Sequence, residues 1–272
     1  MQKKAAVVND FSSFGRCSLA VTIPILSAMK VQCCPVPTAI FTNHTGYPSF
    51  SWTDYTDHMD DYIREWKKIG LRFDAVQTGF LGSKAQIDFV FRFLDAFRDE
   101  RTIVAIDPVM GDYGRLYSTY SRELAESMRR FLTVADILTP NLTEACVLAG
   151  TEYDPRISDS GLEHLARSLS EPNGAKVAIT GIQRNGDIVD FVYERGKAPH
   201  LHAEPKIGED RSGTGDVFSS VILGDAVNGV PFDESVVKAG AFVARAVRRS
   251  VEMDIPVRDG LAFEEVLGDL IC

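Results

Sequence analysis

The chain has 272 residues, of which 45% are hydrophobic and 25% charged, with 29 lysines and arginines against 38 aspartates and glutamates. This is the composition of a globular protein with a substantial core, and it excludes a short disulfide-stapled scaffold. The formal net charge of −9, with no run of lysines or arginines, argues against nucleic acid and anionic membranes as partners, because both need a cationic face.

The five cysteines form no C-x-x-C pair, and no histidine lies at metal-ligand spacing from them. A zinc site is therefore not expected. Cys33 and Cys34 are adjacent in an apolar segment, which predicts buried, reduced thiols and a cytoplasmic protein. The apolar runs at 5–8 and 19–29 are too short for a signal-peptide core or a membrane span, so we expect neither.

Short apolar, β-branched runs alternate along the chain with longer segments of helical period, which is the βα rhythm of a parallel sheet. The predicted strands are 5–8, 31–40, 75–78, 103–106, 137–139, 177–180 and 188–193. The predicted helices are 19–29, 55–69, 86–98, 122–131, 143–149, 161–169, 217–228 and 234–249.

Two local features refine this pattern. Pro24 lies inside the first helical segment, where we expect a kink or two short pieces. Gly181, Asn185 and Gly186 separate β-rich pieces, which predicts an antiparallel hairpin at the edge of the sheet. No repeat or linker divides the chain, so the prediction is one α/β domain over 1–272: a single doubly wound, mainly parallel sheet flanked by helices, with a short antiparallel edge.

A glycine-rich turn, D-R-S-G-T-G-D at 210–216, leads directly into the helical pattern that begins at Val217. Glycines let the backbone approach a ligand, and the unpaired N–H groups of a first helical turn favour negative charge. The turn is therefore a candidate anion hole, and Asp216 is placed to take a proton from a hydroxyl that attacks phosphate. The alternative is that Asp216 caps the helix and the glycines only make a tight turn.

Two acidic motifs follow predicted strands. Asp107 and Asp112 lie just after the strand 103–106, where the carboxyl end of a parallel strand could hold a metal or a triphosphate, although a solvated turn would use the same residues. Asn141 and Glu144 are three residues apart after the strand 137–139, which suits Mg²⁺ and phosphate positioning. That spacing equally matches a capping box.

Polar and aromatic residues also end three other predicted strands. They are found at Asn9 and Asp10, at 41–47, which reads F-T-N-H-T-G-Y, and at 78–80. Because parallel strands share one carboxyl edge, these residues predict a binding cleft for a small polar ring. His44 taken alone is more typical of a structural hydrogen-bonding residue.

Four motifs together resemble the pyridoxal kinase family of the ribokinase-like superfamily, in that family's order and over nearly the whole chain. They are N-H-T-G-Y at 43–47, D-P-V-M-G-D at 107–112, T-P-N with Glu144 at 139–144, and G-T-G-D at 213–216. The last indicates only the superfamily. The N-H-T-G-Y segment is more specific, because ribokinase-like sugar kinases generally carry a di-glycine hinge near that point.

The resemblance implies transfer of the γ-phosphoryl group of ATP to the 5′-hydroxymethyl group of pyridoxal, pyridoxamine or pyridoxine. It implies Asp216 as catalytic base and Gly213, Thr214 and Gly215 as the anion hole. It further implies substrate binding by Asp10, His44, Thr45 and Phe80, Mg²⁺ binding by Asp112 and Glu144, and nucleotide binding by Asp107, Asp112, Tyr117, Thr139, Asn141, Glu144 and Thr180. A homodimer and a response to K⁺ are common in such kinases.

Two positions depart from the family pattern. Asp10 stands where better-known pyridoxal kinases carry a serine, and Phe80 stands where a tyrosine is common. A carboxylate at position 10 could pair with a protonated ring nitrogen or accept from the 3-hydroxyl group. The alternatives are a hydroxymethylpyrimidine kinase or another small-molecule kinase of the superfamily, and a ligand-binding homologue without turnover.

Overall fold

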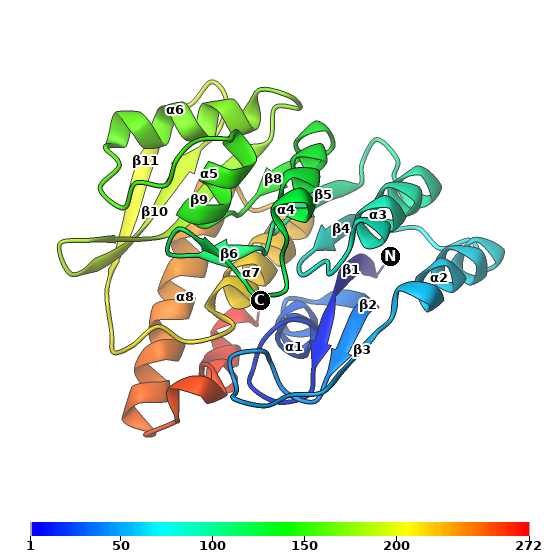
Figure 1. The fold of residues 1–272 in the computed structure, drawn as a ribbon, viewed down its shortest axis with the longest axis horizontal. Helices are drawn as coiled ribbons and strands as arrows, with labels where there is room; N and C mark the ends of the chain where they lie inside the picture. The colour runs from blue at the N-terminus through cyan, green and yellow to red at the C-terminus, as the bar shows by residue number, and fades with distance from the viewer. Residues whose placement is uncertain (1, 272) are drawn as a thin grey trace. The chain divides into compact units, whose positions relative to one another are not determined.

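Parallel strands joined by helices run through residues 2–271, the part of the chain that the computed structural model describes (Figure 1). The described residues form two units. Unit 1 holds the residues up to Ile103 and from Ile207 onward, and unit 2 holds Val104–Lys206. None of the helices in this part of the chain combines the length and the apolar character needed to cross a bilayer.

The sheet of unit 1 is centred on strand β1. Its strands are β1 (Lys3–Ser12), β2 (Val31–Phe41), β3 (Trp52–Asp54) and β4 (Ala75–Thr78), in the order β4-β1-β2-β3. Strand β1 is parallel to β2 and β4, whereas β3 is antiparallel to β2. The run Ala5–Val8 is almost completely buried, as expected for a central strand covered on both faces.

Two groups of helices pack in unit 1. These helices are α1 (Leu19–Ala28), α2 (Thr56–Lys68), α3 (Lys84–Phe97), α7 (Thr214–Asn228) and α8 (Phe232–Glu252), with 3₁₀ turns η2 (Val257–Asp259) and η3 (Phe263–Leu270). Helix α7 contacts α1 and α8, and α2 contacts α3. The second contact is aromatic: Trp66 of α2 packs against Phe73, Phe93 and Phe97.

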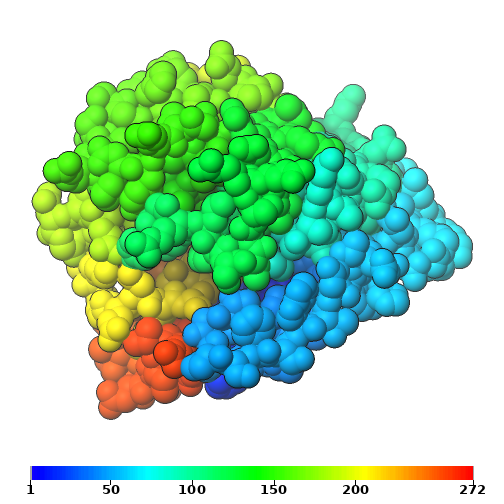
Figure 2. Space-filling view, in the orientation of Figure 1, coloured from blue at the N-terminus to red at the C-terminus, as the bar shows by residue number. Residues whose placement is uncertain are grey.

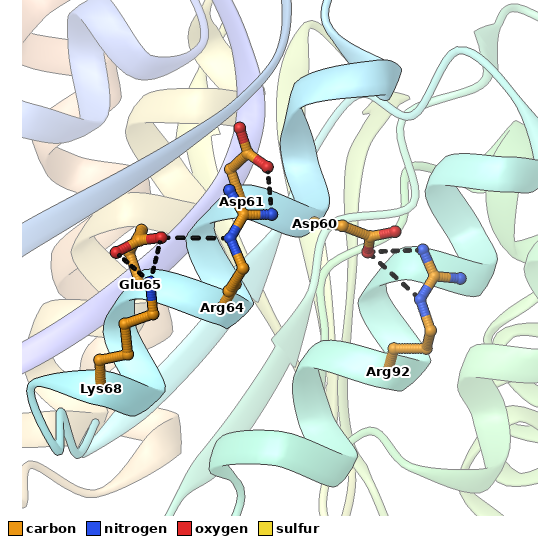
Figure 3. Close-up of polar contacts among 6 residues, drawn as sticks. All are labelled: Asp60, Asp61, Arg64, Glu65, Lys68 and Arg92. Carbon is orange, nitrogen blue, oxygen red and sulfur yellow. Dashed lines mark hydrogen bonds and ion pairs between the residues drawn. The ribbon is translucent and has the colours of Figure 1, made fainter.

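Helix α2, in the light blue part of the space-filling view (Figure 2), carries surface ion pairs (Figure 3). Arg64 and Lys68 both reach Glu65 along the helix, and Arg92 of α3 reaches Asp60 at 2.8 Å. All five side chains are more than half exposed. Since exposed ion pairs contribute at most about 1 kcal/mol each, the aromatic contacts are the main force that holds α2 on α3.

Helix α1 runs through Pro24 as one element, so the expected division into two short pieces is wrong, whereas the expected kink stays a prediction. Proline removes one hydrogen bond from the turn before it. Leu19, Val21, Ile25 and Leu26 of the same helix are completely buried. The burial of these side chains outweighs the missing hydrogen bond and keeps the helix in one piece.

Unit 2 continues the α/β pattern. Its strands are β5 (Ile103–Ile106, the last three residues of which belong to this unit), β6 (Gly111–Asp112), β7 (Arg115–Leu116), β8 (Ile137–Leu138), β9 (Lys176–Arg184), β10 (Asp187–Tyr193) and β11 (His200–Pro205). Its helices are α4 (Arg122–Met128), η1 (Arg129–Thr133), α5 (Leu142–Ala149) and α6 (Asp159–Ser170). The strand order is β11-β10-β9-β8-β5, with a separate β6-β7 ribbon.

The predicted hairpin is confirmed. Strands β9 and β10 are antiparallel, and Asn185 and Gly186 between them have φ of 54° and 91°, which fits a two-residue hairpin turn whose central residues both have positive φ. Strands β5, β8 and β9 are parallel, so the predicted mainly parallel sheet with flanking helices and an antiparallel edge is also confirmed. The predicted strands did not include β3, β6 and β7, because strands of two or three residues are too short to show a period. They also did not include β11, a mostly exposed edge strand with few apolar residues.

The expectation that Cys33 and Cys34 are buried is wrong. Both are free thiols of intermediate exposure. Strand β3 pairs only with Ala39–Phe41 of β2, so among the described strands none extends the sheet beyond the earlier residues of β2, which include both cysteines. Desolvation nevertheless raises the pKa of Cys33 to about 12, which keeps its thiol protonated.

Asp190 is a buried carboxyl group on β10. Its Oδ1 accepts a hydrogen bond from the Gly181 N–H at 3.2 Å, and the β9–β10 register shifts between Val189 and Phe191. Desolvation, with a smaller effect of Glu204, raises the pKa of Asp190 to about 7. A carboxyl group with a raised pKa stabilises the fold at acidic pH, and that stability is lost as the pH rises through 7.

Asp190→Asn should therefore raise the free energy of unfolding at pH 8.5 by about 2 kcal/mol, and the gain should shrink as the pH is lowered toward the ordinary carboxyl range. Urea denaturation at a series of pH values measures this. Asp187→Asn, on the less buried start of the same strand, is the matched control and should bring no such gain. An equal gain at every pH would show that the Asp190 charge is not the cause.

Candidate active site

The glycine-rich turn of unit 1 forms the start of α7. Gly213 is the N-cap residue, with φ of 84°, and a Cβ there would lie 2.0 Å from the carbonyl oxygen of Arg16. Only glycine fits this position. The first helical hydrogen bond runs from the Val217 N–H to the Gly213 carbonyl, so the N–H groups of Thr214 and Gly215 have no partner within the helix. They are the donors that an anion hole requires.

Asp216 lies in the first turn of α7 and does not cap it, so the capping alternative for this residue is wrong. Its Oδ1 accepts from Asn9 Nδ2 at 3.3 Å, and its carboxylate also accepts the main-chain N–H of Ser18. Desolvation is the main cause that raises the pKa of Asp216 to about 6, and the Asp10 charge adds to it. A carboxylate with that pKa is ionised near neutral pH and still basic enough to accept a proton.

Asp10 and Asn9 lie together at the end of β1. Asp10 is buried and accepts from Ser12 Oγ at 2.9 Å and from Ser18 Oγ at 2.6 Å. Desolvation raises its pKa, while these hydroxyl groups oppose the rise. Asn9 Oδ1 accepts the Phe80 N–H at 2.8 Å, so Asn9 links Phe80 to Asp216. Sequence reasoning placed Asn9 at a strand end but missed this bridging role, which depends on residues more than 70 positions away.

The N-H-T-G-Y loop is held by the segment near residue 258. His44 Nε2 lies 2.7 Å from the Arg258 carbonyl oxygen, and the Gly46 N–H donates to His44 Nδ1 at 3.1 Å. The Tyr47 hydroxyl donates to Asp259 Oδ1 at 2.6 Å. Since both ring nitrogens of His44 have protein partners, His44 orders the loop. Thr45 is exposed, and its contact with a substrate, like those of His44 and Phe80, stays a prediction.

In unit 2 the predicted capping box is confirmed. Asn141 Oδ1 accepts the Glu144 N–H at 3.0 Å, and Glu144 Oε2 accepts the Asn141 N–H at 2.9 Å. Glu144 Oε1 accepts the Met110 N–H at 3.1 Å, and Asn141 Nδ2 donates to the Gly111 carbonyl at 2.8 Å. The box therefore also fixes the backbone that follows β5. Desolvation and the nearby Asp107 charge raise the pKa of Glu144 well above its usual value.

The other residues predicted for nucleotide and metal also belong to unit 2. Thr180 forms an isolated parallel bridge with Asn141, Thr139 and Asp107 are buried, and Asp112 and Tyr117 are exposed. Among the described residues no group of three or more His, Cys, Asp or Glu could hold a metal by itself. Mg²⁺ in phosphoryl transfer needs only one or two carboxylates besides water and phosphate, so Asp112 and Glu144 fit that ion.

Known proteins are similar to this chain in sequence. A family model described as phosphomethylpyrimidine kinase matches residues 23–257. The pyridoxal kinase of Arabidopsis thaliana is 31% identical over 203 residues, which are 70% of this chain and 63% of the plant protein. The chain therefore spans less than two thirds of that relative's length.

Two solved structures are also similar. One is a Bacteroides thetaiotaomicron protein assigned to the phosphomethylpyrimidine kinases and crystallised with pyridoxal. It is 38% identical with a TM-score of 0.96, and the match covers 100% of this chain and 96% of that one. The other is the pyridoxal kinase of Lactobacillus plantarum, 26% identical with a TM-score of 0.92, where the match covers 100% and 97%.

Proposed function

The chain belongs to the phosphomethylpyrimidine kinase family, and we propose that it is a kinase that transfers the γ-phosphoryl group of ATP to the 5′-hydroxymethyl group of a B6 vitamer. The observation that carries this proposal is the pairing of Asp216, a carboxylate with a pKa of about 6, with the anion-binding turn at Gly213. The similar Bacteroides protein that was crystallised with pyridoxal supports the choice of substrate.

In this function Asp216 accepts the proton of the hydroxymethyl group as its oxygen attacks the γ-phosphorus. The backbone N–H groups of Gly213, Thr214 and Gly215 stabilise the negative charge that develops on the transferred group. Little covalent chemistry is left for the protein, so positioning and electrostatic stabilisation account for most of the rate.

Unit 2 supplies the residues that we assign to the nucleotide and its metal. Asp112 and Glu144 would hold Mg²⁺, which when bound neutralises phosphate charge. Glu144 would act mainly through bound water, since both of its oxygens already accept hydrogen bonds. The residues assigned to ATP itself are Asp107, Tyr117, Thr139, Asn141 and Thr180. We also propose K⁺ as a second cation of the reaction, as the family resemblance implies.

We assign the pyridine ring to unit 1. Asp10 would pair with a protonated ring nitrogen or accept from the 3-hydroxyl group, Phe80 would stack on the ring, and Thr45 would donate to it. Position 10 carries a carboxylate where the family has a serine, so we expect Asp10 to influence which B6 vitamer this chain prefers.

We also propose that the whole chain, 1–272, acts as one kinase domain in a cytoplasmic homodimer. Light scattering after size-exclusion chromatography tests the dimer.

A second candidate is hydroxymethylpyrimidine kinase, which the description of the matching family model favours. A substrate panel separates the two: ATP consumption with pyridoxal, pyridoxamine, pyridoxine, hydroxymethylpyrimidine and ribose, with each product confirmed by mass. Turnover on a B6 vitamer supports the proposal. Turnover on the pyrimidine alone replaces it and removes the assignments of Asp10, Thr45 and Phe80, whereas ligand binding without any product indicates a non-catalytic homologue.

The pH profile of kcat/KM should fall on the acidic side with a midpoint near the Asp216 pKa of about 6, because only the ionised carboxylate accepts a proton. Asp10→Ser should move this midpoint to lower pH, since the variant lacks a negative charge that raises the pKa of Asp216. Steady-state rates from pH 4.5 to 8.5, at vitamer concentrations well below KM, measure both midpoints. A midpoint that stays in place in the Asp10 variant contradicts the assigned charge interaction.

A further inference from the structure

Ser18 is the N-cap residue of α1, but its side chain does not cap the helix. Its hydroxyl makes no hydrogen bond to the first turn, and its backbone has φ of 56° and ψ of −139°. Residues other than glycine rarely adopt that conformation. The N-cap serines of α3, α4 and α6 are extended, and each accepts an N–H of its own helix: Ser83, Ser121 and Ser158. Helix capping therefore does not explain the strained backbone of Ser18.

The donors of Ser18 are directed at two buried carboxyl groups. Its hydroxyl donates to Asp10 Oδ1 at 2.6 Å, and its main-chain N–H donates to the Asp216 carboxylate. Asp10 comes from β1 and Asp216 from α7, so one buried residue joins two elements that are far apart in the sequence. A strained backbone conformation persists where the surrounding structure fixes it, and such positions are concentrated at functional sites.

Buried hydroxyl groups fix Ser18 from the other side. The Ser18 carbonyl accepts the Thr22 N–H at 3.0 Å and Thr22 Oγ1 at 3.2 Å. Ser220 Oγ lies 2.9 Å from Thr22 Oγ1 and 2.6 Å from the Asp216 carbonyl oxygen. Thr22 and Ser220 are both almost completely buried. The first turns of α1 and α7 are therefore connected by hydrogen bonds, which holds Ser18 and Asp216 in a fixed relation.

The hydroxyl of Ser18 also acts on the charge of Asp10. Desolvation raises the pKa of Asp10, and the hydrogen bond from Ser18 opposes this rise more than the one from Ser12 does. An ionised carboxylate has only acceptor sites, so the remaining lone pairs of Asp10 need a donor. A protonated ring nitrogen or a 3-hydroxyl group of a vitamer is such a donor.

We propose that Ser18 is a positioning residue for both carboxyl groups: its hydroxyl fixes the Asp10 carboxylate for the substrate ring, and its main-chain N–H holds Asp216 beside the anion-hole turn. The strained backbone lets a single residue make both contacts. This inference rests on the proposed function, and it adds a residue that controls vitamer binding without touching the vitamer.

The first test compares Ser18→Ala with Ser18→Gly. Both variants lack the hydroxyl, but glycine adopts φ of 56° without strain, whereas alanine does not. Both should raise the KM for pyridoxal by at least about fivefold, through the loss of a hydrogen bond to a charged group, and change the KM for ATP by less than about twofold. The kcat should stay within about threefold of the parent, because both variants keep the main-chain N–H at Asp216.

Two comparisons separate this role from a general effect on folding. Thr22→Val is the matched control, because it removes a buried hydroxyl from the same helix whose partners are Ser18 and Ser220. It should lower the melting temperature and leave both KM values close to those of the parent. In an Asp10→Ser background, Ser18→Ala should add less than about twofold to the KM for pyridoxal, since no carboxylate is left to hold.

A melting experiment gives a readout without kinase activity. Losing the Ser18 hydroxyl should raise the pKa of Asp10 further, so the melting temperature of Ser18→Ala should fall more, relative to the parent, at pH 8 than at pH 5. In the Asp10→Ser background this difference should not depend on pH. The other titratable groups around Asp10 are His44, Asp216 and Cys17, and they are present in all four proteins, so their contributions cancel.

Three results would overturn the inference. They are a KM for pyridoxal that glycine at position 18 restores to the parent value, additive losses in the Asp10→Ser background, and a loss of melting temperature that is equal at pH 5 and pH 8. If Ser18→Ala does not fold, Ser18→Gly is used in its place in the last two experiments. If no vitamer is turned over, the proposed function fails, and the melting experiment still decides whether Ser18 holds Asp10.

Discussion

Replacing Asp216 by alanine should lower kcat by at least about a hundredfold, the low end for a positioned general base, while the KM for ATP changes little. The reason is local: the carboxylate lies at the start of α7, held by Asn9 and by the Ser18 N–H, and its removal leaves Gly213 and the turn in place. Steady-state kinetics with pyridoxal and ATP measure both constants. A variant that keeps most of its turnover would refute the role of base.

Asp216→Asn provides the control for folding. Its amide has nearly the same shape but cannot accept the proton, so kcat should fall as far as in the alanine variant. Because the pKa of Asp216 is raised to about 6, the ionised carboxylate destabilises the fold above that pH. The asparagine variant should therefore melt at a higher temperature than the parent at pH 8. If Asp216→Asn is less active and yet melts at a higher temperature than the parent, its lost activity comes from the missing base and not from unfolding.

Replacing Gly213 by alanine should lower kcat/KM by about a hundredfold or more, comparable to the loss of one oxyanion-hole donor. With φ of 84° and the Arg16 carbonyl 2.0 Å from a Cβ, the turn must move, and its N–H groups move with it. The loss should appear with every substrate that the protein phosphorylates, since the proposed anion hole would contact the transferred group and not the substrate ring. Kinetics with two vitamers check this.

Gly229→Ala is the matched control for this substitution. Gly229 lies at the other end of α7 with φ of 81°, and a Cβ there meets no atom within 4 Å. Alanine at position 229 therefore introduces a similar conformational strain but does not displace the proposed anion hole. Gly229→Ala should lower the melting temperature and leave kcat/KM close to that of the parent. Equal losses of activity in the two variants would mean that strain in α7, and not the anion hole, is responsible.

Local patterns determined much of the secondary structure and several site residues. The apolar runs at 75–78 and 103–106 coincide with β4 and β5, and the Asn-Gly pair at 185–186 forms the expected hairpin turn. A capping box joins two residues that are three positions apart, so the spacing of Asn141 and Glu144 was enough to predict it. Helix α7 begins at Thr214, three residues before the apolar pattern at 217, because the glycine turn already has the geometry of a helix start.

Long-range contacts decided the rest. The sequence by itself determined the α/β class, the strand ends and the glycine turn, because periodicity, turn chemistry and helix starts depend on residues a few positions apart. Only the tertiary structure decided that Asn9 holds Asp216, that the Arg258 carbonyl holds His44, and that the Arg211 guanidinium donates to the Gly260 carbonyl. Each of these contacts joins residues that are 49 or more positions apart, and burial by such distant segments is also what kept α1 whole at Pro24.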